Sequence, residues 1–387
     1  MRSPSWILPT LLASALLVAC GGGDDKVQFT SVVSFGDSVS DVGTYKVGTI
    51  AQLGGGKFTV NGAGGSVWTE FLATSVGAPA QCAAQTGMLP NNGATGAAVQ
   101  NFASCFNYAQ GSSRVSSSGT GPNGVALQTA LGAQNLGFMA VSLQQQFSSH
   151  LTKMGGSYKG TELVTVNGGG NDLFAQLTAV STAAGGGQAA LATGTVAGWS
   201  QATLDVVVLG GQSAFDAAVA AAARGMGQAG AELAGYVNTL VVAKGARYVL
   251  VRNFADLTFA PGYLQADAGT KGLMTIMIQA FNSQLKAGLS TAAGAIPAGV
   301  ILIDDYAQTV LIAANPAQYG YSNVSVQNCG PNAFGSPNGQ SIVCNTINLI
   351  AGDTSKYFFS DSVHPTPYAH QKAAETALAL MVAAGWQ

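Results

Sequence analysis

The regular alternation of short apolar runs with longer helical segments constrains the fold of this chain more than any other feature. Five runs have the length and the β-branched or aromatic content of buried strands. They are residues 28–35, 106–109, 163–166, 247–251 and 300–303. Strands that alternate with helices form a parallel sheet with right-handed crossovers and with helices on both faces. We therefore predict an α/β fold, a three-layer α/β/α sandwich whose central parallel sheet has about five strands.

Helical periodicity predicts the connections between these strands. Helices are expected over residues 67–73, 141–154, 213–243 and 274–289. The third is long enough to be mistaken for a membrane span, but alanine is only weakly hydrophobic, and the segment carries Asp216, Arg224 and Glu232. These charges favour a helix that packs on the sheet. His150, in the second helix, lies among Gln and Ser, which favours a solvated position.

Composition limits the class of protein. The chain has 387 residues, of which 48% are hydrophobic and 8% charged. This is enough apolar material for one large domain or two small ones. The net charge is −2, and no basic stripe offers nucleic acid an electrostatic footprint. His150 and His370 have no clustered neighbours at metal-ligand spacing, so no metal site is expected. We expect a monomer that needs no cofactor and binds no nucleic acid.

The first 20 residues have the pattern of an export signal. Arg2 precedes an apolar run over residues 6–18, which is too short to span a bilayer comfortably. The run ends in Leu17-Val18-Ala19-Cys20, which resembles the lipobox of bacterial lipoproteins, in which the cysteine is lipidated. The alternative is an ordinary signal peptide with a cysteine that happens to lie near the cleavage site.

The lipobox resemblance implies a division of the chain. We expect a signal peptide over residues 1–19, lipidation at Cys20, a flexible tether over 20–28 and one domain over 29–387. The Gly-rich sequence after the cysteine suits a tether. The protein would then be exported and lipid-anchored to a bacterial membrane. Gly21, in place of Asp after the cysteine, favours the outer membrane, on its periplasmic or surface face.

The cysteines fit an oxidising compartment. Four of the five remain when Cys20 is set aside, which is enough for two disulfides with three possible connectivities. We favour Cys82–Cys105 and Cys329–Cys344, because each pair is close in sequence and lies in a Gly/Asn-rich stretch that needs a constraint.

Small polar turns follow three of the predicted strands and carry Ser38, Gly111 and Asn171. In a parallel sheet, such turns converge on the edge where open α/β sheets bind their ligands. Gly-Asp-Ser by itself also occurs in ordinary turns. The case for chemistry at Ser38 therefore depends on a base and on an acid that orients the base.

A base and an acid occur together near the end of the chain. Asp361 and His364 are three residues apart, so a tight turn can bring both side chains to one side. His364 is the one histidine of three with a carboxylate at this spacing. The chain order Ser38, Asp361, His364 is similar to that of the α/β-hydrolases, although the Gly-x-Ser-x-Gly elbow is missing.

Four sequence blocks carry these residues. They are Gly36-Asp37-Ser38, Gly111, Gly169-Gly170-Asn171-Asp172 and Asp361-Ser362-Val363-His364. In this order they resemble the blocks of the GDSL, or SGNH, hydrolase family, whose fold is a flavodoxin-like sandwich, over essentially the whole mature chain. Residues 35–41, 107–109 and 315–320 further resemble its bacterial phospholipase/lecithinase/hemolysin-like esterases and lipases. The chain departs from the family at Val39, where Leu is usual, and at Gly111-Ser112, where a Gly-Gly pair is common.

The resemblance implies a serine carboxylester hydrolase, an esterase or lipase that works through an acyl-enzyme. Ser38 would be the nucleophile, His364 the base and Asp361 the residue that orients it. The backbone N–H groups of Ser38 and Gly111 and the side chain of Asn171 would form the oxyanion hole.

The sequence blocks contain further carboxylates, and the sequence leaves other functions open. Asp37, Asp41 and Asp172 are expected to fix loops by accepting backbone N–H groups. An acyltransferase and a catalytically inactive surface-binding lipoprotein remain alternatives. The sequence does not define the ester substrate, lipid or small acyl ester, nor whether the Gly/Ala-rich insertions form a lid.

Overall fold

A four-stranded parallel sheet forms the centre of the protein. The computed structural model describes residues 26–88, 95–115, 140–185, 199 and 201–387. The sheet has the strand order β1 (Val32–Phe35), β4 (Leu163–Val166), β5 (Tyr248–Arg252) and β6 (Val300–Ile303), and each neighbouring pair is parallel. Crossovers that contain helices join the strands, which confirms the α/β prediction.

Residues 106–109, which were predicted as a fifth strand, run along the free edge of β1 but do not form a regular strand. Ser34 N–H donates to the Phe106 carbonyl at 3.0 Å, and Tyr108 N–H donates to the Ser34 carbonyl at 2.7 Å. The pairing is a single bridge between Ser34 and Asn107. The Asn107 side chain accepts the N–H of Ala109 and donates to the Ser40 carbonyl, so the segment turns away after one bridge. The described sheet therefore has four regular strands where about five were predicted.

Helices cover both faces of the sheet because adjacent strand side chains point to opposite sides. Val33, Phe35 and Val251 lie in one core with Phe147 and Phe281, under α3 (Leu143–Lys153), α4 (Gly170–Ala184), α7 (Gly211–Tyr236) and α8 (Ala268–Leu289). The opposite core contains Val32, Leu163 and Ile303 and is closed by α2 (Trp68–Ser75) and α10 (Pro367–Ala383).

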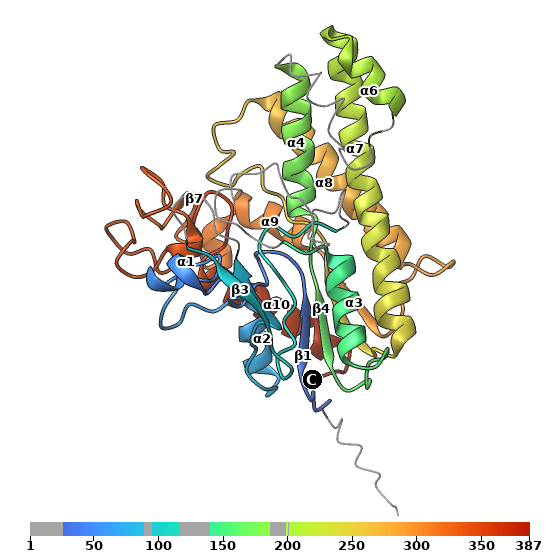
Figure 1. Ribbon diagram of the computed structural model, residues 1–387, viewed down its shortest axis with the longest axis vertical. Coiled ribbons are helices and arrows are strands. Elements are labelled where there is room, and N and C mark those ends of the chain that lie inside the picture. Colours follow the sequence, from blue (N-terminus) through green and yellow to red (C-terminus); the bar gives the residue numbers. More distant parts are fainter. Residues whose placement is uncertain (1–25, 89–94, 116–139, 186–198, 200) are drawn as a thin grey trace, which may run out of the picture.

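The remaining elements lie around this sandwich. They are α1 (Gly48–Gln52), α6 (Gln201–Val208), α9 (Asp305–Ala314), the antiparallel strands β2 (Gln85–Met88) and β3 (Ala97–Asn101), and the parallel strands β7 (Asn323–Gln327) and β8 (Tyr357–Phe359). In Figure 1, α4, α6 and the upper part of α7 extend beyond the sheet, away from the end that holds the C terminus. Val27 N–H donates to the Trp386 carbonyl at that lower end.

The Ala-rich segment forms α7 and continues through a π-helical turn, Val237–Val241, and a 3₁₀ turn, Val242–Lys244. Its small residues allow close packing on α8, since a Cβ at Gly230 would collide with the Phe281 backbone. This confirms a helix packed within the domain. Within the described ranges, no helix combines the length and the apolar character needed to cross a membrane.

His150 is buried, although the sequence predicted a solvated position. Its side chain is fully buried, its ring lies edge-on to Phe35, and its Nδ1 is 3.2 Å from Tyr108 Oη. Burial and the nearby Lys153 lower the pKa of His150 to about 4. The prediction was wrong because α3 packs against β1, and Phe35 and Tyr108, which contact the imidazole, come from distant parts of the chain.

Both predicted disulfides are present, Cys82–Cys105 and Cys329–Cys344. The first joins the loop after α2 to the start of the irregular edge segment. The second lies in the C-terminal loops, close to the predicted acid and base.

Candidate active site

Ser38 lies in a tight turn directly after β1. The Ser40 N–H donates to the Asp37 carbonyl, and the Val39 N–H donates to Asp37 Oδ1 at 3.1 Å. Asn167, which follows β4, donates its side-chain amide to Asp37 Oδ1 at 2.8 Å. A Cβ at Gly36 would collide with the Asn167 side chain, so glycine allows the two strand ends to approach. The end of β4 therefore holds the turn of Ser38 in place.

Trp68, predicted as core, is fully buried and also donates its indole N–H to Ser40 Oγ at 2.8 Å. Ser40 Oγ in turn bonds to Asn167 Oδ1. A helix on the far side of the sheet is thus connected to the turn of Ser38.

The C-terminal loop places an imidazole against this serine. His364 Nε2 lies 2.9 Å from Ser38 Oγ, although the two residues are 326 positions apart. His364 Nδ1 lies 2.8 Å from Asp361 Oδ2 and 2.9 Å from Oδ1. Asp361 Oδ1 also accepts the backbone N–H groups of Val363 and His364, which makes the tight turn that the three-residue spacing predicted. An imidazole held in this way can accept the serine proton through Nε2.

The acid and base influence each other's pKa. Burial lowers the pKa of His364, but the Asp361 carboxylate, its hydrogen bond and the more distant Asp37 outweigh burial, so the net direction is upward. Burial would raise the pKa of Asp361, yet the His364 charge and the hydrogen bonds from His364, Ser341 and Val363 lower it well below its usual range. Asp361 is therefore ionised at neutral pH and stabilises a protonated imidazole.

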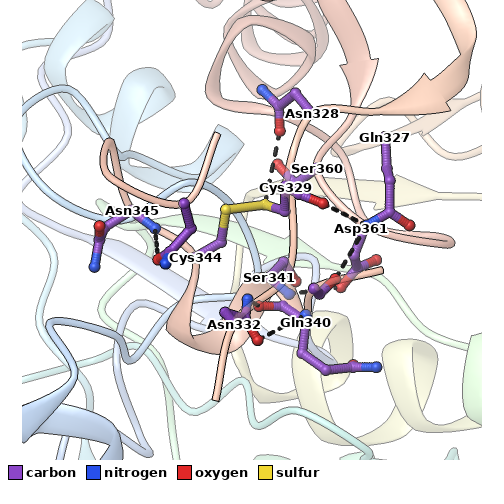
Figure 2. The surroundings of a disulfide bond; sticks show 12 residues. Gln327, Asn328, Cys329, Asn332, Gln340, Ser341, Cys344, Asn345, Ser360 and Asp361 are labelled. Carbon is purple, nitrogen blue, oxygen red and sulfur yellow. Dashed lines mark hydrogen bonds between the residues drawn. A yellow bond between two sulfur atoms is a disulfide. The ribbon is translucent and has the colours of Figure 1, made fainter. Parts of the chain in front are cut away.

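The second disulfide supports the acid. Ser341 N–H donates to Asp361 Oδ2 at 3.0 Å, and Cys329 N–H donates to the Ser360 carbonyl at 2.9 Å. Figure 2 shows that the Cys329–Cys344 bridge lies beside both contacts. Ser341 precedes Cys344 by three residues, so the bridge restrains the loop that donates to the carboxylate. Sequence reasoning missed Ser341, whose one signal was its position between two cysteines.

Asn171 lies in the first turn of α4, near Ser38. Its side-chain amide donates one N–H to the Ser113 carbonyl at 2.9 Å and lines the same cavity as Ser38. An amide group carries two N–H donors. One hydrogen bond therefore fixes the amide, and its second N–H remains for a ligand.

Gly111 does not occupy its predicted place as a backbone donor. Its N–H donates to the buried Asp41 Oδ2 at 2.9 Å, and it is absent from the residues that line the cavity. The prediction fails because Asp41 accepts several backbone N–H groups, including those of Gly43 and Thr44, and draws Gly111 into the same loop. Glycine is still required here, since a Cβ would collide with the Phe58 ring.

The next residue, Ser112, takes the position at the cavity. Its φ is +70°, an unusual left-handed conformation for a residue other than glycine. Among the described residues, the backbone N–H groups of Ser38 and Ser112 have no hydrogen-bond acceptor. Together with Asn171 they supply three donors beside Ser38. Ser112 was not identified from the sequence, although the replacement of a Gly-Gly pair by Gly111-Ser112 marked this position.

The other acidic residues fix loops, as predicted. Asp172 accepts the Val115 N–H at 3.0 Å and pairs with Arg114 at 3.1 Å. Burial raises the pKa of Asp41 to about 6, although its three backbone hydrogen bonds oppose the shift. Burial also raises the pKa of Asp37. None of these carboxylates lies within hydrogen-bond distance of Ser38 Oγ or the His364 ring in the described structure.

A cavity of about 1410 Å³ opens over Ser38 and His364. It is larger than most small-molecule sites, which have volumes of about 300–1,000 Å³. The described part of the chain contains no group of three or more His, Cys, Asp or Glu residues arranged to hold a metal ion.

The fold and the site define a class. A three-layer α/β/α sandwich that holds a serine, an imidazole and a carboxylate in hydrogen-bonded series at the carboxyl ends of its strands has the architecture of a serine hydrolase.

The family is established by comparison with protein-family models. The model of the GDSL-like lipase/acylhydrolase family matches residues 32–377, nearly the whole chain, and the protein belongs to this family. It is thus a hydrolase of ester bonds in general terms. Among curated proteins, none matches the chain.

Proposed function

We propose that this protein is a serine carboxylester hydrolase that forms an acyl-enzyme on Ser38. The observation that carries the proposal is the series of short contacts from Ser38 Oγ to His364 Nε2 and from His364 Nδ1 to Asp361. His364 removes the hydroxyl proton while Ser38 Oγ bonds to the ester carbonyl carbon. Asp361 holds the proton-bearing Nδ1 in place and stabilises the imidazolium.

The tetrahedral intermediate needs donors for its oxyanion. We assign these to the backbone N–H groups of Ser38 and Ser112 and to the Asn171 amide, with Ser112 in place of Gly111. As the carbon–oxygen bond to the alcohol breaks, His364 gives its proton to the leaving oxygen. Water then attacks the acyl carbon, its proton passes to His364, and Ser38 Oγ leaves with that proton.

Hydrolysis of short nitrophenyl esters tests this function. The wild-type protein should hydrolyse p-nitrophenyl acetate or butyrate with saturation kinetics. Ser38→Ala should reduce kcat by a factor on the order of 10⁴ to 10⁶. Ser75→Ala, at the exposed end of α2 and outside the cavity lining, serves as a control that keeps the nucleophile. A folded Ser38→Ala protein with wild-type activity would refute the mechanism.

We further propose that the protein is exported and anchored through Cys20, with residues 29–387 as its one domain. Residues 1–25 lie outside the described ranges, so the proposal depends on the lipobox-like sequence. The first described residues lead into the start of β1, at the end of the sheet that holds the C terminus (Figure 1), whereas Ser38 follows the other end of β1. This arrangement would leave the cavity clear of the anchor. Cys20→Ser should release the protein from membranes, and mass spectrometry of the wild-type N terminus should detect acyl groups. A wild-type N terminus without acyl groups would contradict the anchor.

A further inference from the structure

Two groups of residues that line the cavity over Ser38, called branches below, differ in position relative to the imidazole. One branch is bordered by Phe58, Phe334 and Ile342, which belong to one small apolar cluster. The Phe58 ring contacts the His364 ring, with 5.1 Å between centroids. The other branch begins at Phe254, whose ring lies beside Gly170 at the start of α4, next to the Asn171 donor.

Reaction chemistry distinguishes the two branches. The leaving alcohol must receive its proton from His364, so the alcohol part of an ester lies beside the imidazole. The carbonyl oxygen points toward the donors of Ser38, Ser112 and Asn171. The acyl chain must then leave the carbonyl carbon in the remaining direction, toward the Phe254 branch.

That branch continues as an apolar trench along α4. Six side chains from α4, α8 and the loop between β5 and α8 form its walls, and all of them are half-buried. They are Phe174, Leu177, Thr178, Phe254, Leu257 and Leu273. On α4, positions 171, 174, 178 and 181 lie on one face of the helix, so the trench starts at the Asn171 donor and follows the same face outward.

The trench is firmly held at its base. Asn282 of α8 accepts the Phe254 N–H at 2.7 Å and donates to the Phe254 carbonyl at 2.8 Å. The Phe174 ring stacks near Tyr263, with 6.3 Å between centroids. Farther out, Ile276 and Phe215 line the cavity with 53% and 37% of their surface exposed. Exposed apolar side chains along the wall of a binding cavity indicate an apolar ligand.

We propose that this trench binds the acyl chain of a long-chain fatty ester, so that the preferred substrate is a lipid rather than a short acyl ester. The proposal rests on the ester hydrolase function given above. The distance along α4 from Asn171 to Ser181 is about 15 Å at 1.5 Å per residue. An extended hydrocarbon with C–C bonds of ~1.5 Å advances about 1.3 Å per carbon, so the trench accommodates roughly a dozen carbons.

Chain-length profiles test the trench. kcat/KM of the full-length protein is measured for p-nitrophenyl esters of 2, 4, 8 and 12 carbons, each below its micelle concentration. Burial of each methylene increases kcat/KM by at most about fourfold. We expect a several-fold increase for each two carbons up to the 12-carbon ester.

Thr178→Trp should close the trench about 10 Å from Asn171. It should lower kcat/KM for the 12-carbon ester at least tenfold more than kcat/KM for the 2-carbon ester. Thr275→Trp is the matched control, because Thr275 is also a half-buried helical threonine that bonds its i−4 carbonyl but lies outside the cavity lining. Leu273→Asn, on the opposite wall, provides a second variant if Thr178→Trp does not fold.

The outcomes separate the trench from the proposed function. A wild-type profile that is flat or falls beyond four carbons overturns the trench and leaves the ester hydrolase standing. An unchanged profile in Thr178→Trp and Leu273→Asn, or an equal loss at every length, also overturns it. Failure to hydrolyse any of the four esters overturns the proposed function itself.

Discussion

The floor and the trench of the active-site cavity are built in different ways. The floor consists of Ser38, Ser112, Asn171, Asp361 and His364, and each of these residues lies in a turn fixed by named hydrogen bonds. The trench consists of apolar side chains on two helices and one loop. Directional bonds define the floor, whereas non-directional packing defines the trench.

This difference assigns separate roles to the two regions. Proton transfer and oxyanion binding require atoms to lie within hydrogen-bond distance of the reacting groups, which directional bonds secure. Apolar binding depends on area and shape, so it tolerates changes in side chain. Substitutions in the floor should therefore lower the rate for every ester, while substitutions in the trench should alter the preference among esters. The following predictions test the floor, from the largest effect to the smallest.

Asp361→Asn should cause the largest loss short of removing the nucleophile. An amide cannot stabilise the imidazolium, and kcat should fall by about 10⁴ for short and long esters alike. Asp361→Glu should recover part of the activity, because it keeps the charge. A loss confined to long esters would show that Asp361 acts on the trench instead.

The pH profile follows from the same pair of residues. His364 must be neutral to accept the serine proton, and its pKa is raised above 6.5 because Asp361 and Asp37 outweigh burial. The kcat/KM of the wild-type protein should therefore fall as pH decreases through a midpoint above 6.5. In Asp361→Asn the residual activity should persist to lower pH, because burial then lowers the pKa of His364. A midpoint that stays in place would contradict this origin of the shift.

Asn171→Ala should cost about 10²–10³ in kcat, with a small change in KM, because the lost donor acts on the oxyanion. Asn171→Asp is a matched variant of similar shape that places a negative charge at the oxyanion and should be at least as damaging. An effect on KM alone would indicate that Asn171 stabilises the bound substrate and the transition state equally.

The two disulfides allow a matched comparison within one molecule. The Cys82–Cys105 and Cys329–Cys344 pairs close loops with separations of 23 and 15 residues, so the loss of either should destabilise the protein by a similar amount, about 3 kcal/mol. Only the loss of Cys329–Cys344 should also lower kcat at a temperature where both variants are folded, because it frees the loop that holds Ser341 against Asp361. Equal kcat in the two double-serine variants would show that the Cys329–Cys344 disulfide does not help to position Asp361.

Ser112 should tolerate glycine with the smallest effect. Glycine adopts φ near +70° without strain and keeps the backbone N–H, so Ser112→Gly should retain kcat within a few-fold. Ser112→Val should be clearly worse, because a β-branched residue resists this conformation. Equal kcat in Ser112→Gly and Ser112→Val would contradict the importance of this left-handed conformation for the donor.

Part of this architecture was predictable from local sequence. Four of the five apolar runs, the helical segments and both disulfides correspond to observed elements, and the predicted contact between Ser38 and His364 is present. Strand ends of a parallel sheet converge whatever the details of their loops. The ordered sequence blocks could therefore indicate which residues meet.

The remaining features depend on geometry that local sequence leaves open. Gly111 and Ser112 both have a backbone N–H that could bind the oxyanion. Asp41, 70 residues earlier, accepts the Gly111 N–H, so only the Ser112 N–H remains for the oxyanion. The trench depends on how α4 lies relative to α8, which is a result of long-range packing. His150 was misjudged for the same reason, since its neighbours Tyr108 and Tyr158 lie in segments outside α3.

Covalent labelling tests the central claim most directly. A fluorophosphonate reacts with a serine that a neighbouring base activates, and the adduct is located by mass spectrometry of the folded protein. We predict one adduct, on Ser38, that disappears in His364→Ala while Ser40 stays unmodified. A folded wild-type protein that remains unlabelled, or that is labelled at another residue, would contradict the account.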